Sequence, residues 1–148
     1  MRPIDYFLRS ASQSPEKIFL RDINTVYSYK SAETKIRQIA AAIQVQGLKK
    51  NDSVAVYSPN TADAVICIFG AMMAGASWVP VNIRNSIKTN IDYMEYVHTK
   101  WLFFDSFLEL ELTEKKHNLK SLRKAICIDK KLDEYLSVNE FCAQSDET

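Results

Sequence analysis

The sequence predicts an α/β fold, a mainly parallel β-sheet with helices on both faces. First, short segments rich in β-branched and aromatic residues alternate along the chain with longer segments of helical periodicity. Strands separated by helices pair in parallel through right-handed crossovers. Second, the segment 64–74 between two of these strands is apolar almost all round. A helix without a polar face is buried on most sides, which fits a helix packed against a sheet.

The N-terminal part of the chain is expected to form a helix, a hairpin and a second helix. Ile4–Ser12 has an amphipathic pattern, and Lys17–Arg21 and Thr25–Tyr27 flank a polar turn that favours a hairpin. Apolar residues then recur at helical spacing from Ser31 to Gln46, and Gly47 follows as a C-terminal cap. The recurring residues are Ile36, Ile39, Ala40 and Ile43.

A strand–helix–strand crossover occupies residues 51–84. Ser53–Tyr57 alternates polar and apolar residues and is rich in β-branched ones, so it predicts a strand. Pro59 interrupts that strand, and Asn60 or Thr61 can cap the helix that follows. Gly75 ends this helix before a second apolar strand, residues 77–81, which contains Pro80.

The pattern of helix and strand repeats further along. Ser86–His98 predicts a helix, Trp101–Phe104 a strand and Ala125–Ile128 a short buried strand. Ser106–His117 favours a helix, although the alternation of Leu108, Leu110 and Leu112 leaves a strand as the alternative. We expect residues 1–143 to form one unit and the polar residues 144–148 to be disordered.

Composition places the chain among ordinary globular domains. The 148 residues are enough for one domain with a buried core, and 47% hydrophobic and 25% charged residues are usual values. A net charge of +1 gives no electrostatic argument for nucleic acid or an anionic membrane. Cys67, Cys127 and Cys142 lack metal-ligand or redox spacing, so we expect reduced thiols in a cytoplasmic protein. No stretch is long and apolar enough for a signal peptide or a transmembrane span.

The crossover ends in a way that resembles a known family. A strand ending at Pro59-Asn60, a buried helix carrying Gly70-Ala71 and Ala74-Gly75-Ala76, and then the run Trp78–Arg84 are similar to the N-terminal region of adenylate-forming enzymes. This superfamily comprises acyl-CoA synthetases, nonribosomal peptide adenylation domains and beetle luciferases. The resemblance runs from about Tyr6 to Phe141.

Flanking segments extend the resemblance and show two departures from it. Tyr27–Lys30 resembles the Thr-Tyr pair that opens the family's first long helix, with Ser28 in place of Thr. Asn51-Asp52 stands where Gly-Asp is more usual. Downstream, Asn82–Asn85 and Trp101–Ser106 look most like fatty-acid and aryl-acid CoA ligases, as do Asn90 and Tyr93-Met94.

The residues that would perform the family's chemistry are not in this sequence. The resemblance implies ATP, Mg²⁺ and CoA for the full-length enzyme, together with a phosphate loop rich in Ser, Thr and Gly. This chain has three glycines, Gly47, Gly70 and Gly75, and they form no such cluster. We therefore assign it no cofactor, metal site or catalytic residue of its own. The chain stops at Thr148, about where that loop would follow, so we expect an N-terminal piece that is inactive alone.

One loop carries a binding hypothesis. Asn82–Asn85 follows the C-terminal end of a predicted parallel strand and precedes a helix, where α/β sheets gather ligands. In CoA ligases, which the chain resembles, this loop lies near the CoA site, so Asn82 and Arg84 are candidate CoA-proximal residues. The alternative is that Arg84 pairs with a carboxylate or packs against the rest of the enzyme.

Other side chains favour structural roles. His98 and His117 lie near predicted helix ends among polar neighbours, which indicates solvated imidazoles. The spacing of Tyr93, Tyr96 and Trp101 indicates core or half-buried packing.

Two functional classes therefore remain. One is the N-terminal part of an acid–CoA ligase or, as a variant, of a nonribosomal peptide-type adenylation domain. The other is a non-catalytic α/β binding or assembly module. The expected partner is the rest of the enzyme. A homo-oligomer through surface left exposed is also expected, with Phe103, Phe104 and Phe107 as candidate contacts.

Overall fold

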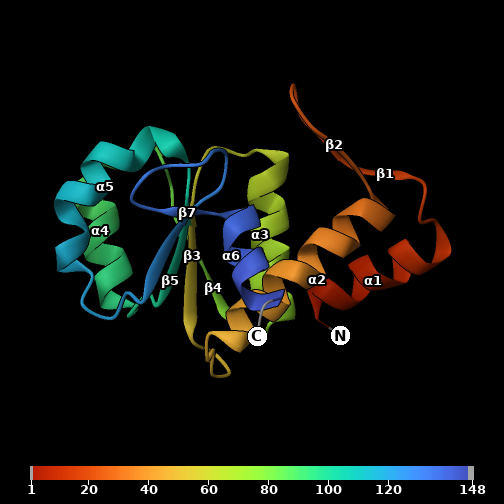
Figure 1. The fold of residues 1–148 in the computed structure, drawn as a ribbon, viewed down its shortest axis with the longest axis horizontal. Coiled ribbons are helices and arrows are strands. Elements are labelled where there is room, and N and C mark those ends of the chain that lie inside the picture. Colours follow the sequence, from red (N-terminus) through yellow and green to blue (C-terminus); the bar gives the residue numbers. More distant parts are fainter. Residues whose placement is uncertain (1, 147–148) are drawn as a thin grey trace.

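Five parallel strands form the centre of the computed structural model, which describes residues 2–146 (Figure 1). Their order across the sheet is β4-β3-β5-β6-β7. The strands are β3 (Ser53–Tyr57), β4 (Ser77–Pro80), β5 (Trp101–Phe104), β6 (Lys124–Cys127) and β7 (Leu136–Ser137). The predicted parallel sheet of four segments is therefore confirmed, and β7 extends it at one edge. Pro80, which has no N–H to donate, lies in β4 at the other edge, where a strand tolerates proline.

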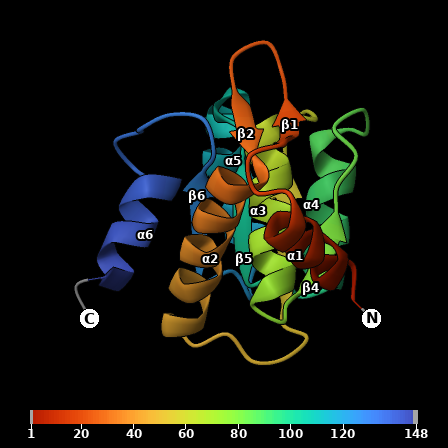
Figure 2. The same ribbon diagram turned by 90° about the vertical axis from the view of Figure 1, so that its right-hand side faces the viewer.

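Helices cover both faces of the sheet, as the sequence predicts. On one face lie α1 (Pro3–Gln13), α2 (Tyr29–Val45), α3 (Ala62–Met73) and α6 (Val138–Asp146). In Figure 2, α1 and α2 lie in front of the sheet, and α6 lies to the left of α2. The opposite face is covered by α4 (Ile87–Tyr96) and by α5 (Glu109–Lys115), which is flanked by the 3₁₀ turns η1 (Ser106–Leu108) and η2 (Lys116–Asn118).

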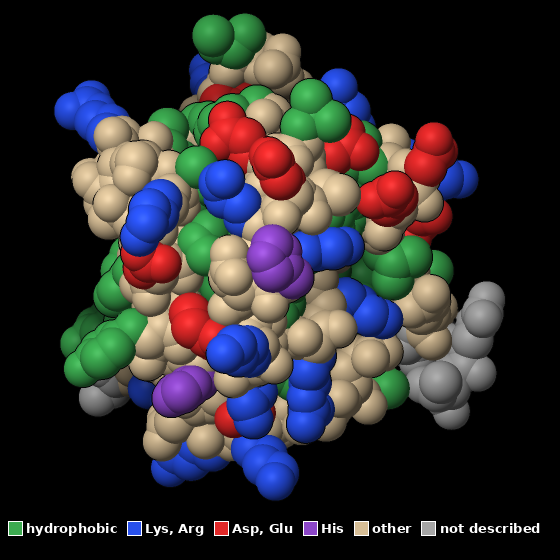
Figure 3. Space-filling view, turned by 90° about the vertical axis from the view of Figure 1, so that its left-hand side faces the viewer, with side chains coloured by type: hydrophobic (Ala, Val, Ile, Leu, Met, Phe, Trp, Pro, Cys, Tyr) green, Lys and Arg blue, Asp and Glu red, His purple; other side chains and the backbone are tan. Residues whose placement is uncertain are grey.

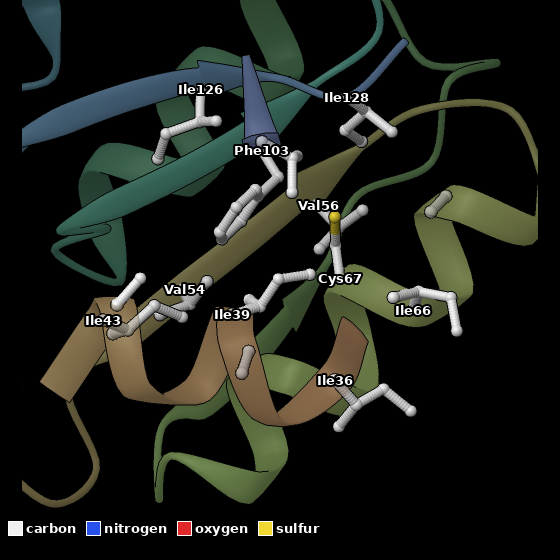
Figure 4. Close-up of a cluster of buried hydrophobic side chains, with 14 of the residues drawn as sticks. Ile36, Ile39, Ile43, Val54, Val56, Ile66, Cys67, Phe103, Ile126 and Ile128 are labelled. Carbon is white, nitrogen blue, oxygen red and sulfur yellow. The ribbon is translucent and has the colours of Figure 1, made fainter. Parts of the chain in front are cut away.

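Side-chain alternation along the strands divides the core in two. Val56, Phe103 and Ile126 are register partners on three neighbouring strands and belong to the core on the α2–α3 face, which also contains Ile39 (Figure 4). Leu102, one residue before Phe103, belongs to the core under α4 and α5. Because successive strand residues point to opposite faces, every central strand supplies both cores.

Caps fix the ends of the helices near the predicted positions. The Ser28 hydroxyl accepts a hydrogen bond from the Ser31 N–H at 3.1 Å and starts α2. Thr61, one of the two candidate caps, accepts from the Ala64 N–H at 3.1 Å and starts α3. Gly75 follows the C-terminal end of α3 and has a φ of +91°, a backbone conformation that residues with a Cβ rarely adopt.

The N-terminal hairpin forms a separate two-stranded antiparallel sheet of β1 (Ile18–Arg21) and β2 (Val26–Ser28). It is held at the start of α3 by two carboxylates. Asp22 accepts from the Ala62 N–H at 2.8 Å, and the Tyr27 hydroxyl donates to Asp63 at 2.5 Å.

Two sequence predictions about the C-terminal half differ from the structure, and two further elements there were not predicted. Residues 106–117 form a short α-helix between two 3₁₀ turns, so a single helix is an oversimplification and the alternative strand is wrong. Strand β7 and helix α6 were not predicted. Phe141 is fully buried and packs α6 onto the core, and the helix runs to Asp146, so residues 144–146 of the predicted disordered tail are helical. Residues 147–148 lie outside the described residues.

Burial corrects the assignment of several aromatic side chains. Trp101 is buried as predicted, but Tyr93 is 42% and Tyr96 is 81% exposed because Ile91 and Met94 occupy the inner face of α4. Phe103 and Phe104, two of the residues expected to form an oligomer contact, are fully buried inside the chain because helices cover both faces of β5. That contact would have to form without them.

The first prediction concerns the close packing of α3 against α2 at Gly70. A Cβ on residue 70 would lie 2.6 Å from Ile39 Cγ2, so Gly70→Ala should destabilise the fold by about 1–3 kcal/mol. Ile39→Ala removes the Cγ2 contact but keeps Ile39 Cβ, which lies 2.8 Å from the added atom, so it relieves part of the clash. The double variant should therefore be destabilised by less than the sum of the two single changes. Urea denaturation of the four proteins measures this coupling, and strict additivity would contradict the account.

Self-association remains a prediction, now restricted to a smaller surface. Phe107 in η1 is 58% exposed, and Leu110, three residues later in the first turn of α5, is 83% exposed. We expect sedimentation over a concentration series to show dimerisation that Phe107→Ser with Leu110→Ser weakens. A monomer at every concentration, or dimerisation indifferent to this double change, would exclude the surface.

Candidate functional site

The carboxyl ends of the parallel strands meet at one edge of the sheet. Residues 58–60 follow β3, residues 81–85 follow β4, Asp105 follows β5, and Ile128-Asp129 follow β6. In open α/β sheets ligands bind at this edge. The Asn82–Asn85 loop lies there, as the sequence predicts.

Asn82 is the centre of the loop's hydrogen bonding. Its side-chain Oδ1 accepts from the Arg84 N–H at 2.9 Å, and its backbone carbonyl accepts from the Asn85 N–H at 3.1 Å. The same carbonyl accepts from Asn90 Nδ2 at 2.9 Å. Asn82 therefore shapes the loop through its own backbone and side chain, and the structure gives it no contact that requires a ligand.

Arg84 presents a free cation at this edge. The residue is exposed, and among the described residues its guanidinium makes no ion pair. It lines a shallow groove of about 330 Å³ between the loops 58–60 and 81–84. The next helix, α4, starts beside it with Ser86 as N-cap, accepting from the Thr89 N–H at 3.1 Å. The carboxylate partner that was the alternative for Arg84 is thus not found in the described part of the chain.

A second polar network joins the ends of β5 and β6. Asp129 accepts hydrogen bonds from the Ser106 N–H at 2.8 Å, the Ser106 hydroxyl at 2.6 Å and the Cys127 thiol at 3.3 Å. Although burial opposes ionisation, the Ser106 and Cys127 hydrogen bonds hold the pKa of the Asp129 carboxyl below its usual range. This carboxylate is engaged in tying two loops together, a structural role that sequence patterns did not indicate.

The adjoining cavity of about 470 Å³ lies between α2, α3 and the loop after β6. Cys67 lines it, but burial raises the pKa of its thiol, so the thiol stays protonated and is a poor nucleophile. Burial, followed by the hydrogen bond to Asp63, likewise raises the pKa of the Tyr27 hydroxyl. These groups lack the activated nucleophile and base that catalysis would require.

The remaining candidates do not form a reactive centre. His98 and His117 are both exposed, and Figure 3 shows the two histidines at the surface among interspersed acidic and basic side chains. Between residues 2 and 146, no group of three or more His, Cys, Asp or Glu could hold a metal ion. Within the same range, no helix is long and apolar enough to cross a membrane.

Fold and edge together define an α/β protein with polar loops at the carboxyl ends of a parallel sheet that helices cover on both faces. The family model described as "AMP-binding enzyme" matches residues 7–147. The chain therefore belongs to the AMP-binding enzyme family, as its resemblance to adenylate-forming enzymes predicts.

Individual relatives cover parts of the chain. It is 32% identical over 91 residues to 3-[(3aS,4S,7aS)-7a-methyl-1,5-dioxo-octahydro-1H-inden-4-yl]propanoyl:CoA ligase of Rhodococcus jostii strain RHA1, which takes in 62% of this chain and 18% of that ligase. It is 30% identical over 79 residues to a probable non-canonical nonribosomal peptide synthetase of Salinispora arenicola strain CNS-205, 53% of this chain and 1% of that protein.

The fold is shared with a solved ligase. The anthranilate CoA ligase AuaEII, in complex with anthranoyl-AMP, superposes with a TM-score of 0.88 at 17% identity, over 95% of this chain and 27% of that chain. The chain thus spans less than a third of the length of these proteins, and its match lies in their shared fold.

The Asp129 network predicts a specific acid sensitivity. Because the pKa of Asp129 is lowered on folding, its contribution is complete above the unfolded value near 3.8 and is lost as the pH falls through the folded value. Asp129→Asn should remove that part of the acid destabilisation and lower stability at neutral pH by about 0.5–1 kcal/mol, after solvent screening.

Thermal unfolding between pH 7 and pH 2 measures the effect. Asp133→Asn is the control, since Asp133 is exposed and makes no ion pair among the described residues. An Asp129→Asn profile parallel to that of the parent chain at all pH values would contradict it.

Proposed function

We propose that this chain acts as the N-terminal part of an ATP-dependent acid–CoA ligase. Such an enzyme joins an acid to AMP, releasing pyrophosphate, and then transfers the acyl group to the thiol of CoA, releasing AMP. The observation that carries the proposal is the agreement of 95% of the chain with 27% of a CoA ligase, at a TM-score of 0.88, within the AMP-binding enzyme family.

We also propose that the enzyme is a CoA ligase and not a nonribosomal peptide synthetase. The CoA ligase of Rhodococcus jostii aligns over 91 residues at 32% identity, against 79 residues at 30% for the peptide synthetase. The ending Trp101–Ser106 supports a fatty or aryl acid as substrate rather than an amino acid. The start of a nonribosomal peptide-type adenylation domain remains the alternative.

Within such an enzyme, the described residues supply a scaffold and one binding loop. The scaffold is the subdomain predicted as residues 1–143. We propose that Arg84 meets a phosphate of CoA, and its exposure and lack of an ion-pair partner among the described residues support this role. Asn82 supports Arg84 by its hydrogen bond to the Arg84 N–H. ATP, Mg²⁺ and the acid would be held by further parts of a cytoplasmic enzyme, which is this chain's proposed partner.

We further propose that the 148-residue chain alone does not form an acyl-adenylate. Its three glycines are occupied structurally: Gly70 at a helix contact, and Gly47 and Gly75 at positive φ after helices. None of them can contribute to a phosphate loop. A free-standing binding or assembly module would show the same lack of activity, so inactivity alone does not separate these two classes.

We predict that the chain shows no pyrophosphate exchange above background with ATP–Mg²⁺ and a panel of fatty, aryl and amino acids. Calorimetry with ATP–Mg²⁺ should likewise show no saturable binding. Exchange above background, or saturable micromolar binding, would overturn the proposed division of labour.

The reading frame of the gene after codon 148 distinguishes the ligase from the free-standing binding or assembly module. A reading frame that continues past codon 148 into a Ser/Thr/Gly-rich loop supports the ligase, and the same exchange assay on that longer product then identifies the acid. A stop codon at that position would contradict the ligase and favour the binding module.

A further inference from the structure

Asn90 is an amide buried where the core is otherwise apolar. It lies on the inner face of α4 beside Ile91 and is 2% exposed. Together with Thr99 it makes up the fully buried polar residues in the described part of the chain. Burying an amide is unfavourable unless its hydrogen bonds are satisfied. The position of these hydrogen bonds therefore indicates what the amide does.

Both bonds of Asn90 Nδ2 end at the carboxyl edge of the sheet. It donates to the Tyr57 hydroxyl at 2.8 Å and to the Asn82 carbonyl at 2.9 Å. Tyr57 is the last residue of β3, and Asn82 lies two residues after the end of β4. The amide therefore connects a fixed strand end to the first residue of the loop that carries Arg84.

The loop has few other attachments. Its two internal hydrogen bonds are both accepted by Asn82: the Arg84 N–H donates to Asn82 Oδ1, and the Asn85 N–H donates to the Asn82 carbonyl. Residues 82–86 are exposed, so packing holds them weakly. The orientation of Asn82, and through it that of Arg84, thus depends on the bond from Asn90. Burial, the largest influence, raises the pKa of the Tyr57 hydroxyl, which keeps it a neutral partner for the amide.

We propose that Asn90, seated on the Tyr57 hydroxyl, is a positioning residue that holds the Asn82–Asn85 loop in the conformation that presents Arg84 to its ligand. It acts through Asn82 and does not itself touch the ligand. The ligand assignment rests on the proposed function, since Arg84 is taken there to meet a CoA phosphate. The positioning of the loop does not rest on it.

Loop order can be tested on the complete 148-residue chain by amide–water exchange in NMR. In Asn90→Leu, which fills the site without donors, the Arg84 and Asn85 amides should exchange about tenfold faster or more, the scale of one lost hydrogen bond. Tyr57→Phe keeps the ring and Asn90 but removes the acceptor, so it should accelerate the same amides by a smaller factor.

Ile91→Val is the matched control. It removes one methyl group from the next residue of the same buried face, lowers stability and leaves the loop bonds intact. It should leave the Arg84 and Asn85 exchange rates unchanged relative to the rest of the chain. Equal rates in Asn90→Leu and Ile91→Val would overturn the proposal. If Asn90→Leu does not fold, unchanged loop exchange in Tyr57→Phe overturns it instead.

Titration with coenzyme A tests the positioning role of Asn90 and the CoA assignment of Arg84 separately. In the parent chain and in Ile91→Val, the Arg84 Nε–H signal should shift on saturation, and in Asn90→Leu the affinity should fall severalfold. Equal affinity in Asn90→Leu would overturn the positioning role. If the parent chain shows no shift, the CoA assignment of Arg84 is wrong, and the exchange rates alone then decide whether Asn90 positions the loop.

Discussion

The burial of the central sheet on both faces is the constraint on which the rest of this structure depends. Each central strand gives alternate side chains to two cores, as with Leu102 on one face and Phe103 on the other. A strand committed to two cores has no side chain left for a ligand. Polar chemistry is therefore confined to the loops at the strand ends, where Arg84 and Asp129 lie.

The same constraint explains which parts of the fold were predictable. Strand alternation, the Thr61 cap, the Gly75 end and the helical spacing around Ile39 are local signals, and each has its structural counterpart. Strand β7 has two residues, too short for any alternation, so it was missed. Helix α6 was also missed, although Val138, Phe141 and Cys142 share the spacing of one helix face. Tyr93 and Tyr96 were misplaced because a helix at one side of a sheet needs only one apolar stripe, which Ile91 and Met94 supply.

The candidate site was only partly predictable. The position of the Asn82–Asn85 loop follows from strand order. Its attachment to the end of β3 runs through Asn90 and Tyr57, which lie 8 and 25 residues from Asn82 in the sequence, so it could not be predicted. One signal was available: Ile87, Asn90, Ile91 and Met94 share the spacing of a single helix face, which places an amide among core residues. The Asp129–Ser106 pair had no comparable signal, because 23 residues separate its members.

The proposed function places ligand binding at the carboxyl edge of the sheet, where the fold gathers its loops. The chain spans 27% of the anthranilate CoA ligase and 18% of the Rhodococcus jostii ligase. In the proposed function it supplies a scaffold, and the loops at the carboxyl edge of that scaffold meet the ligand. The rigidity of those loops depends on that of the strands that carry them.

Native-state hydrogen exchange tests the double burial of the sheet most directly. The account predicts that the amides of β3 and β5, central and covered on both faces, exchange only through global unfolding, with one common free energy. It also predicts that the amides of the outer strand β7 open at lower free energy. Exchange of β5 amides by local opening, faster than those of the surrounding helices, would contradict it.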